Sequence, residues 1–361
     1  TCKLEMRVYK KRIGEAGLKP LLMFHGGSWN ARQGGMIGLQ SQLSHYTDDG
    51  FVVFTPFYRL ARENEAEANI ECNGVTGEAI VEDANDALNW VREHAASYGG
   101  VVGSNGVLVA GQSAGGHLAA SLAVHRPDQV SRALLFYPPT DFPSVIGDWQ
   151  TNGIPENTLG LAAINGFIGE SVETVDYANN ALVQDNEFPK FAAAKQGQIP
   201  PLYMIHGDDD ALVPVTQSAR LCNGLTGDAD NGPASDLTMP AGAARKVIEC
   251  DDAESQLHVI AGADHILDVC IKIGGVIEIV CPTGTIASQN AARKSIIGAR
   301  AWLFRDANSV VTSSDSGERD EPNPSNESPQ TGNNNTSGGG TVSLLGLFFL
   351  FLRGIRGKLA R

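Results

Sequence analysis

Short apolar runs alternate with amphipathic stretches between residue 4 and about residue 306. Apolar runs that end in loop-forming residues are typical of buried strands, and they occur at 19–24, 50–55, 106–110, 133–137, 202–205 and 257–260. Apolar residues at helical spacing instead mark 78–94, 116–124 and 289–304. Strands that alternate with helices predict the α/β class, a mostly parallel sheet with helices packed on both faces.

Three segments interrupt this alternation. The segment 138–200 is long, rich in Gly, Pro and Asn and weakly periodic, so we expect a cap or lid over the edge of the sheet. The segment 222–250 looks like an irregular insertion. The segment 270–281 has two apolar runs around Gly274-Gly275, which predicts a hairpin.

The chain contains six cysteines, an even number that allows 15 pairings. Cys270 and Cys281 stand at the two ends of the predicted hairpin, where the chain ends lie close together. We therefore predict a Cys270–Cys281 disulfide, provided that the compartment is oxidising.

The composition changes abruptly after residue 306. Residues 307–337 are rich in Ser, Asn, Pro and Glu and almost free of apolar side chains, which predicts a disordered linker. Residues 338–361 then combine a glycine cluster, the apolar run Val342–Leu352 and a basic end. The domain predicted to carry the chemistry is therefore 1–306.

The formal net charge of the chain is −14. Binding to nucleic acid needs a basic surface that releases counterions from phosphates. The acidic balance therefore argues against a nucleic-acid partner.

Residues 111–115 read Gly-Gln-Ser-Ala-Gly and lie between an apolar strand and a helix. Glycines on both sides of a serine allow a tight strand-to-helix turn that exposes the hydroxyl above the sheet. The helix that follows directs its positive N-terminus toward developing negative charge. This context predicts that Ser113 is a nucleophile, against the alternative of a structural serine in a glycine-rich turn.

A serine nucleophile needs a base and a group that orients the base. The strand 202–205 leads into His206-Gly207-Asp208-Asp209-Asp210, and the strand 257–260 leads into a loop that contains His265. We expect His265 to accept the proton of Ser113 and Asp210 to fix the imidazole tautomer. Asp209 is the alternative acid, and a solvated acidic turn is the alternative for all three aspartates.

The strand 19–24 is followed by His25-Gly26-Gly27-Ser28-Trp29. Two consecutive glycines let backbone N–H groups approach a substrate oxygen, which is the requirement for an oxyanion hole. We expect Gly26 and Gly27 to supply such donors together with the N–H of Ala114. The alternative is an ordinary Gly-Gly turn.

These motifs, with Tyr58-Arg59-Leu60 and Glu82-Asp83 between them, resemble in order and spacing the α/β-hydrolase esterases. The nearest groups are the hormone-sensitive-lipase-like carboxylesterases and the bacterial feruloyl-esterase-like enzymes. The resemblance implies an α/β-hydrolase fold, a role for Asp83 in supporting the oxyanion loop, and ester hydrolysis through an acyl-enzyme without metal or organic cofactor. A small-molecule ester is then the expected substrate. Alternatives are a serine peptidase on the same fold and an inactive surface-binding module.

The tail resembles a second pattern, the Gly-Gly-containing C-terminal sorting signals of bacterial exported proteins. The run Val342–Leu352 is short for a membrane span, and the basic residues after it favour the cytoplasmic side. The resemblance implies transient anchoring in the bacterial inner membrane through 341–352 and cleavage by a membrane protease near Gly338–Gly340. The enzyme is then expected at the cell surface or outside the cell.

Overall fold

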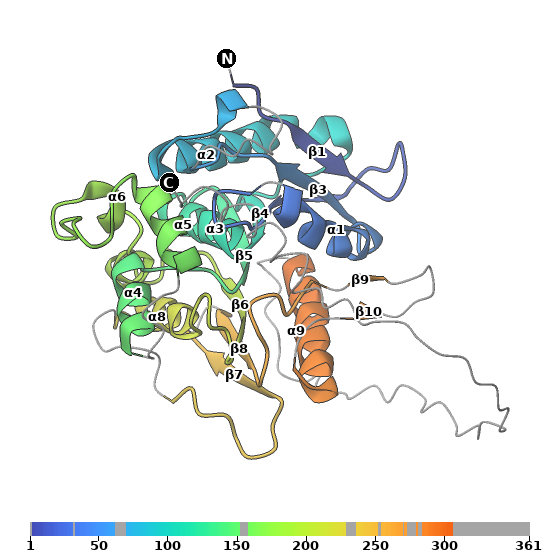
Figure 1. Cartoon of the computed structure of the whole chain (residues 1–361). Helices are drawn as coiled ribbons and strands as arrows, with labels where there is room; N and C mark the ends of the chain where they lie inside the picture. Colours follow the sequence, from blue (N-terminus) through green and yellow to red (C-terminus); the bar gives the residue numbers. More distant parts are fainter. Residues whose placement is uncertain are drawn as a thin grey trace, which may run out of the picture. The chain divides into compact units, whose positions relative to one another are not determined.

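A mostly parallel sheet of eight strands runs through the described part of the chain, with helices on both faces (Figure 1). The computed structural model describes residues 2–31, 33–61, 70–151, 158–228, 236–251, 254–269, 271–272, 279–280 and 284–305. Residues 1–309 form one compact unit, and every described helix and strand belongs to it.

The strands follow the order β1-β3-β2-β4-β5-β6-β8-β7 across the sheet. The outer strands β1 and β7 are antiparallel to their neighbours, and all other neighbours are parallel. Their bounds are β1 Met6–Tyr9, β2 Lys19–Phe24, β3 Phe51–Pro56, β4 Val107–Gln112, β5 Val130–Phe136, β6 Leu202–Gly207, β7 Arg245–Glu249 and β8 Gln256–Ile260. The α/β class predicted from the alternating pattern is confirmed.

Two hydrophobic cores cover the two faces of the sheet. One core contains side chains of α2, α3 and α8, and the other contains side chains of α1 and α9. Neighbouring strand residues alternate between them, as period-two geometry requires: Leu22 and Phe24 belong to the first core, and Leu21 and Met23 to the second. A strand buried on both faces reads as a continuous apolar run, which is why these strands were visible in the sequence.

The helices are α1 Gln33–Asp48, α2 Gly77–His94, α3 Ala114–His125, α4 Phe142–Thr151, α5 Thr158–Ile168, α6 Ala181–Gln184, α7 Phe188–Ala194, α8 Thr216–Leu225 and α9 Ile286–Phe304. The α9 helix begins with a side-chain cap, since Thr285 accepts from the N–H of Ser288. Its buried face includes Ala292, Ala299 and Trp302, which pack against the sheet beside α1.

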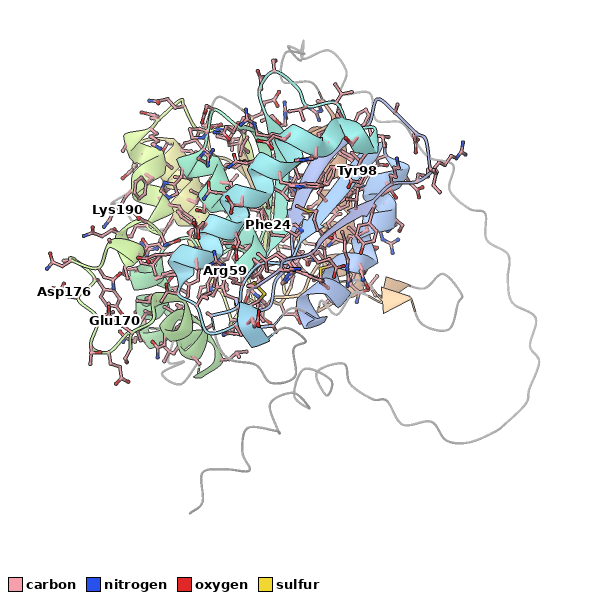
Figure 2. The ribbon with its side chains drawn as sticks, turned by 90° about the horizontal axis from the view of Figure 1, so that it is seen from above. Phe24, Arg59, Tyr98, Glu170, Asp176 and Lys190 are labelled. Atoms are coloured by element: carbon pink, nitrogen blue, oxygen red, sulfur yellow. A yellow bond between two sulfur atoms is a disulfide. The ribbon has the colours of Figure 1, made fainter. Side chains whose placement is uncertain are left out.

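The predicted cap segment 138–200 contains α4, α5, α6 and α7. Side chains of α4 and α5 line a pocket beside Ser113, whereas α7 packs against α3 and α8. Seen from above, Glu170, Asp176 and Lys190 of this segment lie on one side of the molecule, away from Phe24 in the sheet (Figure 2). Among the described residues of the segment, Pro139 and side chains of α4 and α5 line the pocket.

The segment 222–250 is more regular than its sequence suggested. It contains β7, which adds an antiparallel edge strand to β8. A disulfide joins Cys222 at the end of α8 to Cys250 directly after β7, and a second one joins Cys2 to Cys72. Strand β7 was missed because an exposed edge strand carries few buried apolar residues, and none of its five residues is buried.

The predicted hairpin at 270–281 is present in its described residues. Ile271–Lys272 (β9) pairs antiparallel with Ile279–Val280 (β10). Cys270 and Cys281 lie outside the described residues, as do the predicted linker 307–337 and the tail 338–361. Among the helices that the structure describes, none has the length and apolarity that crossing a membrane requires.

Candidate active site

Four loops converge at the carboxyl edge of the parallel strands. Ser113 follows β4, Asp210 follows β6, His265 follows β8, and the Gly26-Gly27 loop follows β2. Because these strands are mutually parallel, the ends of all four lie at one edge of the sheet. The fold therefore brings together Ser113 and His265, which are 152 residues apart.

Ser113 occupies a strained turn between β4 and α3. Its φ is 53° and its ψ −120°, a region that residues with side chains rarely adopt. A Cβ on Gly111 would lie 2.1 Å from the carbonyl oxygen of Gly115, and one on Gly115 would lie 2.3 Å from that of Phe24. Both glycines are therefore required by close backbone contacts, which is the physical reason for the motif.

The three predicted catalytic side chains form one hydrogen-bonded chain. Nε2 of His265 lies 2.8 Å from Oγ of Ser113, and Nδ1 of His265 lies 2.7 Å from Oδ2 of Asp210. If the Ser113 hydroxyl donates to Nε2, the imidazole proton resides on Nδ1 and is donated to Asp210. This geometry lets His265 remove the Ser113 proton and lets the carboxylate stabilise the resulting cation.

Asp210 differs from its two neighbours in burial. Its side chain is fully buried, and Oδ1 accepts the backbone N–H groups of Leu212 at 3.0 Å and Val213 at 2.8 Å. Asp208 and Asp209 are exposed, and Asp208 accepts the N–H of Gly262. The structure thus brings Asp210, and not Asp209, to His265.

His206 is a second histidine that lies beside the Asp210 carboxylate. It is completely buried, its Nε2 donates to the carbonyl of Val213 at 2.7 Å, and Nδ1 lies 2.8 Å from the hydroxyl of Ser218. Nε2 also lies 3.3 Å from Oδ2 of Asp210. Burial opposes ionisation of Asp210, but His265 and His206 outweigh it and hold the pKa of Asp210 well below its ordinary value.

The predicted oxyanion loop lies directly against the nucleophile. A Cβ on Gly26 would lie 3.0 Å from the carbonyl oxygen of Gln112 and 3.3 Å from Cβ of Ser113. Gly27 has a φ of 115°, which favours glycine. Ala114 begins α3, and N–H groups in a first helical turn have no acceptor within their helix. The loop and this turn are therefore placed to offer donors beside Ser113.

Asp83 contacts the oxyanion loop only through other residues. Its carboxylate accepts the backbone N–H of Arg59 at 2.8 Å and the guanidinium Nε at 2.9 Å. The preceding Tyr58 donates its hydroxyl to the carbonyl of His25 at 2.9 Å and stacks on the His25 ring. Asp83 thus fixes the 58–59 segment, and that segment contacts the loop.

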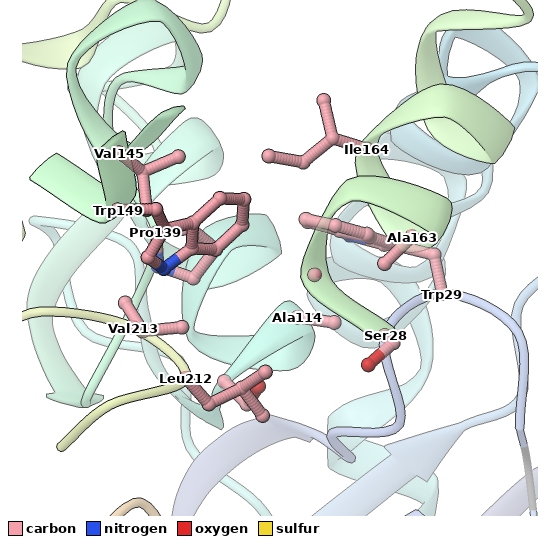
Figure 3. A pocket seen from close by; sticks show the side chains of 12 residues that line it. Ser28, Trp29, Ala114, Pro139, Val145, Trp149, Ala163, Ile164, Leu212 and Val213 are labelled. Carbon is pink, nitrogen blue, oxygen red and sulfur yellow. The ribbon is translucent and has the colours of Figure 1, made fainter. Parts of the chain in front are cut away.

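A pocket opens beside Ser113 toward α4 and α5 (Figure 3). It encloses about 350 Å³ together with the solvent at its mouth. Apart from Ser28 and Ser113, its lining is apolar, with walls from the oxyanion loop, from α4 and α5, and from the loop after Asp210: Trp29, Ala114, Pro139, Val145, Trp149, Gly160, Ala163, Ile164, Leu212 and Val213. Among the described residues that line it, none carries a charge, so it fits an uncharged group attached to the carbon that Ser113 would attack.

Several residues that surround the predicted catalytic side chains had no role predicted from the sequence. Ser28 and Trp29 line the pocket with φ values of 55° each, and the ring of Tyr137 lies 4.6 Å from that of His265. Asp268 is buried three residues after His265. Tyr137 follows a strand that ends at the catalytic edge, and this position was the one signal available for it.

The chain is similar to known proteins over more than half of its length. The protein-family model BD-FAE matches residues 6–225. Among curated proteins, carboxylesterase NlhH of Mycobacterium tuberculosis is 26% identical over 217 residues, which cover 58% of this chain and 61% of NlhH. The carboxylic ester hydrolase LipN of the same species is 30% identical, with 55% of this chain and 50% of LipN covered. The match thus spans about half to three fifths of these relatives.

Solved structures share the fold. A butyrate-bound esterase, Est2 of the planctomycete Thermogutta terrifontis, superposes with a TM-score of 0.51 at 19% identity and covers 84% of this chain and 89% of its own. The sugar hydrolase YeeB of Lactococcus lactis superposes with a TM-score of 0.53 at 16% identity and covers 84% and 94%. The predicted α/β-hydrolase fold is confirmed by this likeness.

Proposed function

The chain belongs to the BD-FAE family, and we propose that it hydrolyses carboxylic esters with Ser113 as the nucleophile. The observation that carries the proposal is the hydrogen-bonded chain from Ser113 through His265 to Asp210. The relatives NlhH and LipN, named as a carboxylesterase and a carboxylic ester hydrolase, support the same substrate class.

In the proposed reaction, Oγ of Ser113 attacks the ester carbonyl while Nε2 of His265 takes its proton. The carbonyl oxygen becomes an oxyanion, which the N–H groups of Gly26, Gly27 and Ala114 would stabilise. His265 then returns the proton to the alcohol that leaves. Water, activated by the same imidazole, attacks the acyl-enzyme, releases the carboxylic acid and restores Ser113.

The proposal is tested by the turnover of short-chain aryl esters and by labelling with a fluorophosphonate probe. An esterase should hydrolyse the esters and incorporate one label, which peptide mapping should locate on Ser113. A peptidase on the same fold would instead prefer matched amide substrates. An inactive binding module would leave both the esters and the probe unchanged.

The apolar pocket beside Ser113 supports a finer proposal, that it holds a short uncharged acyl group. Trp149 of α4 and Ala163 of α5 both line it and are both buried (Figure 3). A shorter side chain at 149 leaves more room for the substrate, and a longer one at 163 leaves less.

We expect Trp149→Leu to shift the preferred acyl chain to longer esters and Ala163→Leu to shift it to acetate. The ratio of kcat/KM for hexanoate to that for acetate esters should change by about 10-fold in opposite directions, since each methylene in a pocket is worth roughly 1–3 kcal/mol. A chain-length series of aryl esters measures this ratio. If the ratio shifts in the same direction in both variants, or does not change, the acyl group binds to another surface.

We further propose that the protein is exported and that its tail is removed near Gly338–Gly340. The Cys2–Cys72 and Cys222–Cys250 bridges support an oxidising compartment, because disulfides persist there and are rare in the cytosol. Mass spectrometry of the protein exported by its native host should find both crosslinks and a C-terminus upstream of Arg361. A chain that ends at Arg361, or that carries reduced cysteines, would contradict this proposal.

A further inference from the structure

Asp268 is a buried carboxylate that the proposed reaction does not use. It lies three residues after His265 and is 1% exposed. A buried carboxylate is costly unless hydrogen-bond donors surround it. Three side chains supply such donors, and they come from three separate parts of the chain: Gln42 of α1, Gln112 of β4 and Tyr137 after β5.

Two of the three side chains that bond Asp268 lie next to a residue of the predicted active site. The amide of Gln112 donates to Oδ2 of Asp268 at 2.5 Å, and the next residue is Ser113. The hydroxyl of Tyr137 donates to Oδ1, and the Tyr137 ring lies 4.6 Å from the His265 ring. Asp268 therefore connects the turn that contains Ser113 to the Tyr137 ring, which packs against His265.

Gln42 anchors the same carboxylate to α1. Its amide donates to Oδ2 of Asp268 and also to the Asp268 backbone carbonyl at 3.2 Å. Burial raises the pKa of Asp268 above its ordinary value, and the hydrogen bonds from Tyr137, Gln112 and Gln42 offset this rise only in part. All three side chains offer donors, so the ionised carboxylate is the form that they fit.

The backbone beside this cluster is strained as well. Tyr137 has a φ of 39°, a value that persists only where surrounding contacts impose it. Its N–H donates to the carbonyl of Ile205 at 3.0 Å, and the preceding Phe136 accepts the N–H of Ser113 at 2.9 Å. Tyr137 is thus linked to the turn of Ser113 in two ways. The backbone bond from Ser113 to Phe136 is one, and the side-chain bonds of Tyr137 and Gln112 to Asp268 are the other.

We infer that Asp268 is a positioning residue that holds the Ser113 turn, the Tyr137 ring and the His265 loop in one rigid arrangement. This inference rests on the proposed function, because the arrangement it maintains is the one between Ser113 and His265. Asp268 touches none of the reacting atoms and acts through Gln112 and Tyr137. A small displacement of the base is enough to slow the transfer of the Ser113 proton.

The experiment compares Asp268→Asn and Tyr137→Phe with Tyr203→Phe. Tyr203 lies on β6, and its hydroxyl donates to the carbonyl of Ser295 at 3.2 Å, near His258. It is a matched control because it is also a buried tyrosine of the same sheet, at the opposite end of its strand from Asp210. Steady-state kinetics on an acetate aryl ester, the rate of fluorophosphonate labelling of Ser113 and the melting temperature are measured for each variant.

We expect Asp268→Asn to lower kcat by about 10- to 100-fold with KM nearly unchanged, as misplacement of a catalytic group does. The labelling rate should fall in parallel. Tyr137→Phe should show a smaller loss of the same kind, and the double variant should lose no more than Asp268→Asn alone, since both changes disrupt the same hydrogen-bonded cluster. Tyr203→Phe should retain kcat and labelling within about twofold, even where its melting temperature falls, because it lies outside this network.

A lower melting temperature of Asp268→Asn with normal kcat and labelling would overturn the inference and leave the esterase proposal intact. If Asp268→Asn does not fold, Tyr137→Phe decides, and normal kcat in that variant overturns the inference. A wild-type protein that neither hydrolyses esters nor takes the label defeats the proposed function itself, and the inference falls with it.

Discussion

Ser113→Ala is expected to lower kcat for a short-chain aryl ester by about 10⁴-fold or more, because loss of a triad nucleophile removes the covalent route. Alanine keeps the Cβ of serine, so the positive φ of the turn is no more strained than before. The pocket also keeps its apolar walls, so KM of any residual activity should change little. Steady-state kinetics and fluorophosphonate labelling measure the effect.

Ser121→Ala is the matched control for this variant. Ser121 is buried and lies on α3, the helix that follows Ser113, about two turns after the nucleophile. Its loss should leave kcat and labelling within about twofold, as expected for independent sites. Equal rates for wild type and Ser113→Ala would remove Ser113 from the reaction.

Asp210→Asn is expected to lower kcat by about 10³- to 10⁴-fold with little change in KM. An asparagine can keep the bonds from the N–H groups of Leu212 and Val213 through its oxygen, but its amide then faces Nδ1 of His265. The imidazole must place its proton on Nε2, and this tautomer cannot accept the proton of Ser113. Kinetics on the same aryl ester measure the loss.

Asp208→Asn and Asp209→Asn are the controls, because both side chains are exposed and neighbour Asp210 in the chain. Both should retain kcat within a few fold, since neither carboxylate is placed at His265 and single contacts at the surface contribute little. A large loss of kcat in Asp209→Asn with normal kcat in Asp210→Asn would show that Asp209, and not Asp210, orients His265.

Asp210→Asn is also expected to change how the stability of the protein depends on pH. The pKa of Asp210 is lowered in the folded protein, so its ionised form contributes stability above the ordinary carboxyl pKa of about 4, and this contribution is lost as the pH falls below it. The difference in unfolding free energy between wild type and Asp210→Asn should therefore be largest near neutral pH and shrink in acid. A difference that grows in acid would contradict the lowered pKa.

The sequence by itself determined the class of fold and the positions of the predicted catalytic side chains along the chain. Buried strands read as apolar runs because both of their faces are covered, and the glycines around Ser113 are required by backbone contacts within a few residues of the turn and with the adjacent strand. Each predicted side chain follows one such strand, so parallel order alone was enough to bring Ser113, Asp210 and His265 to one edge.

Only the tertiary structure decided which groups surround them. Asp208, Asp209 and Asp210 are alike in sequence, and burial against His206 and His265 distinguishes the third. Cys222 pairs with Cys250, which directly follows the edge strand β7. No apolar run in the sequence predicted this strand.

Asp268 makes the same point more strongly. Its partner Gln42 is 226 residues away and its partner Gln112 is 156 residues away. Periodicity and turn residues report contacts within one element, whereas a buried polar cluster is selected by side chains from several elements that meet only after the sheet has formed.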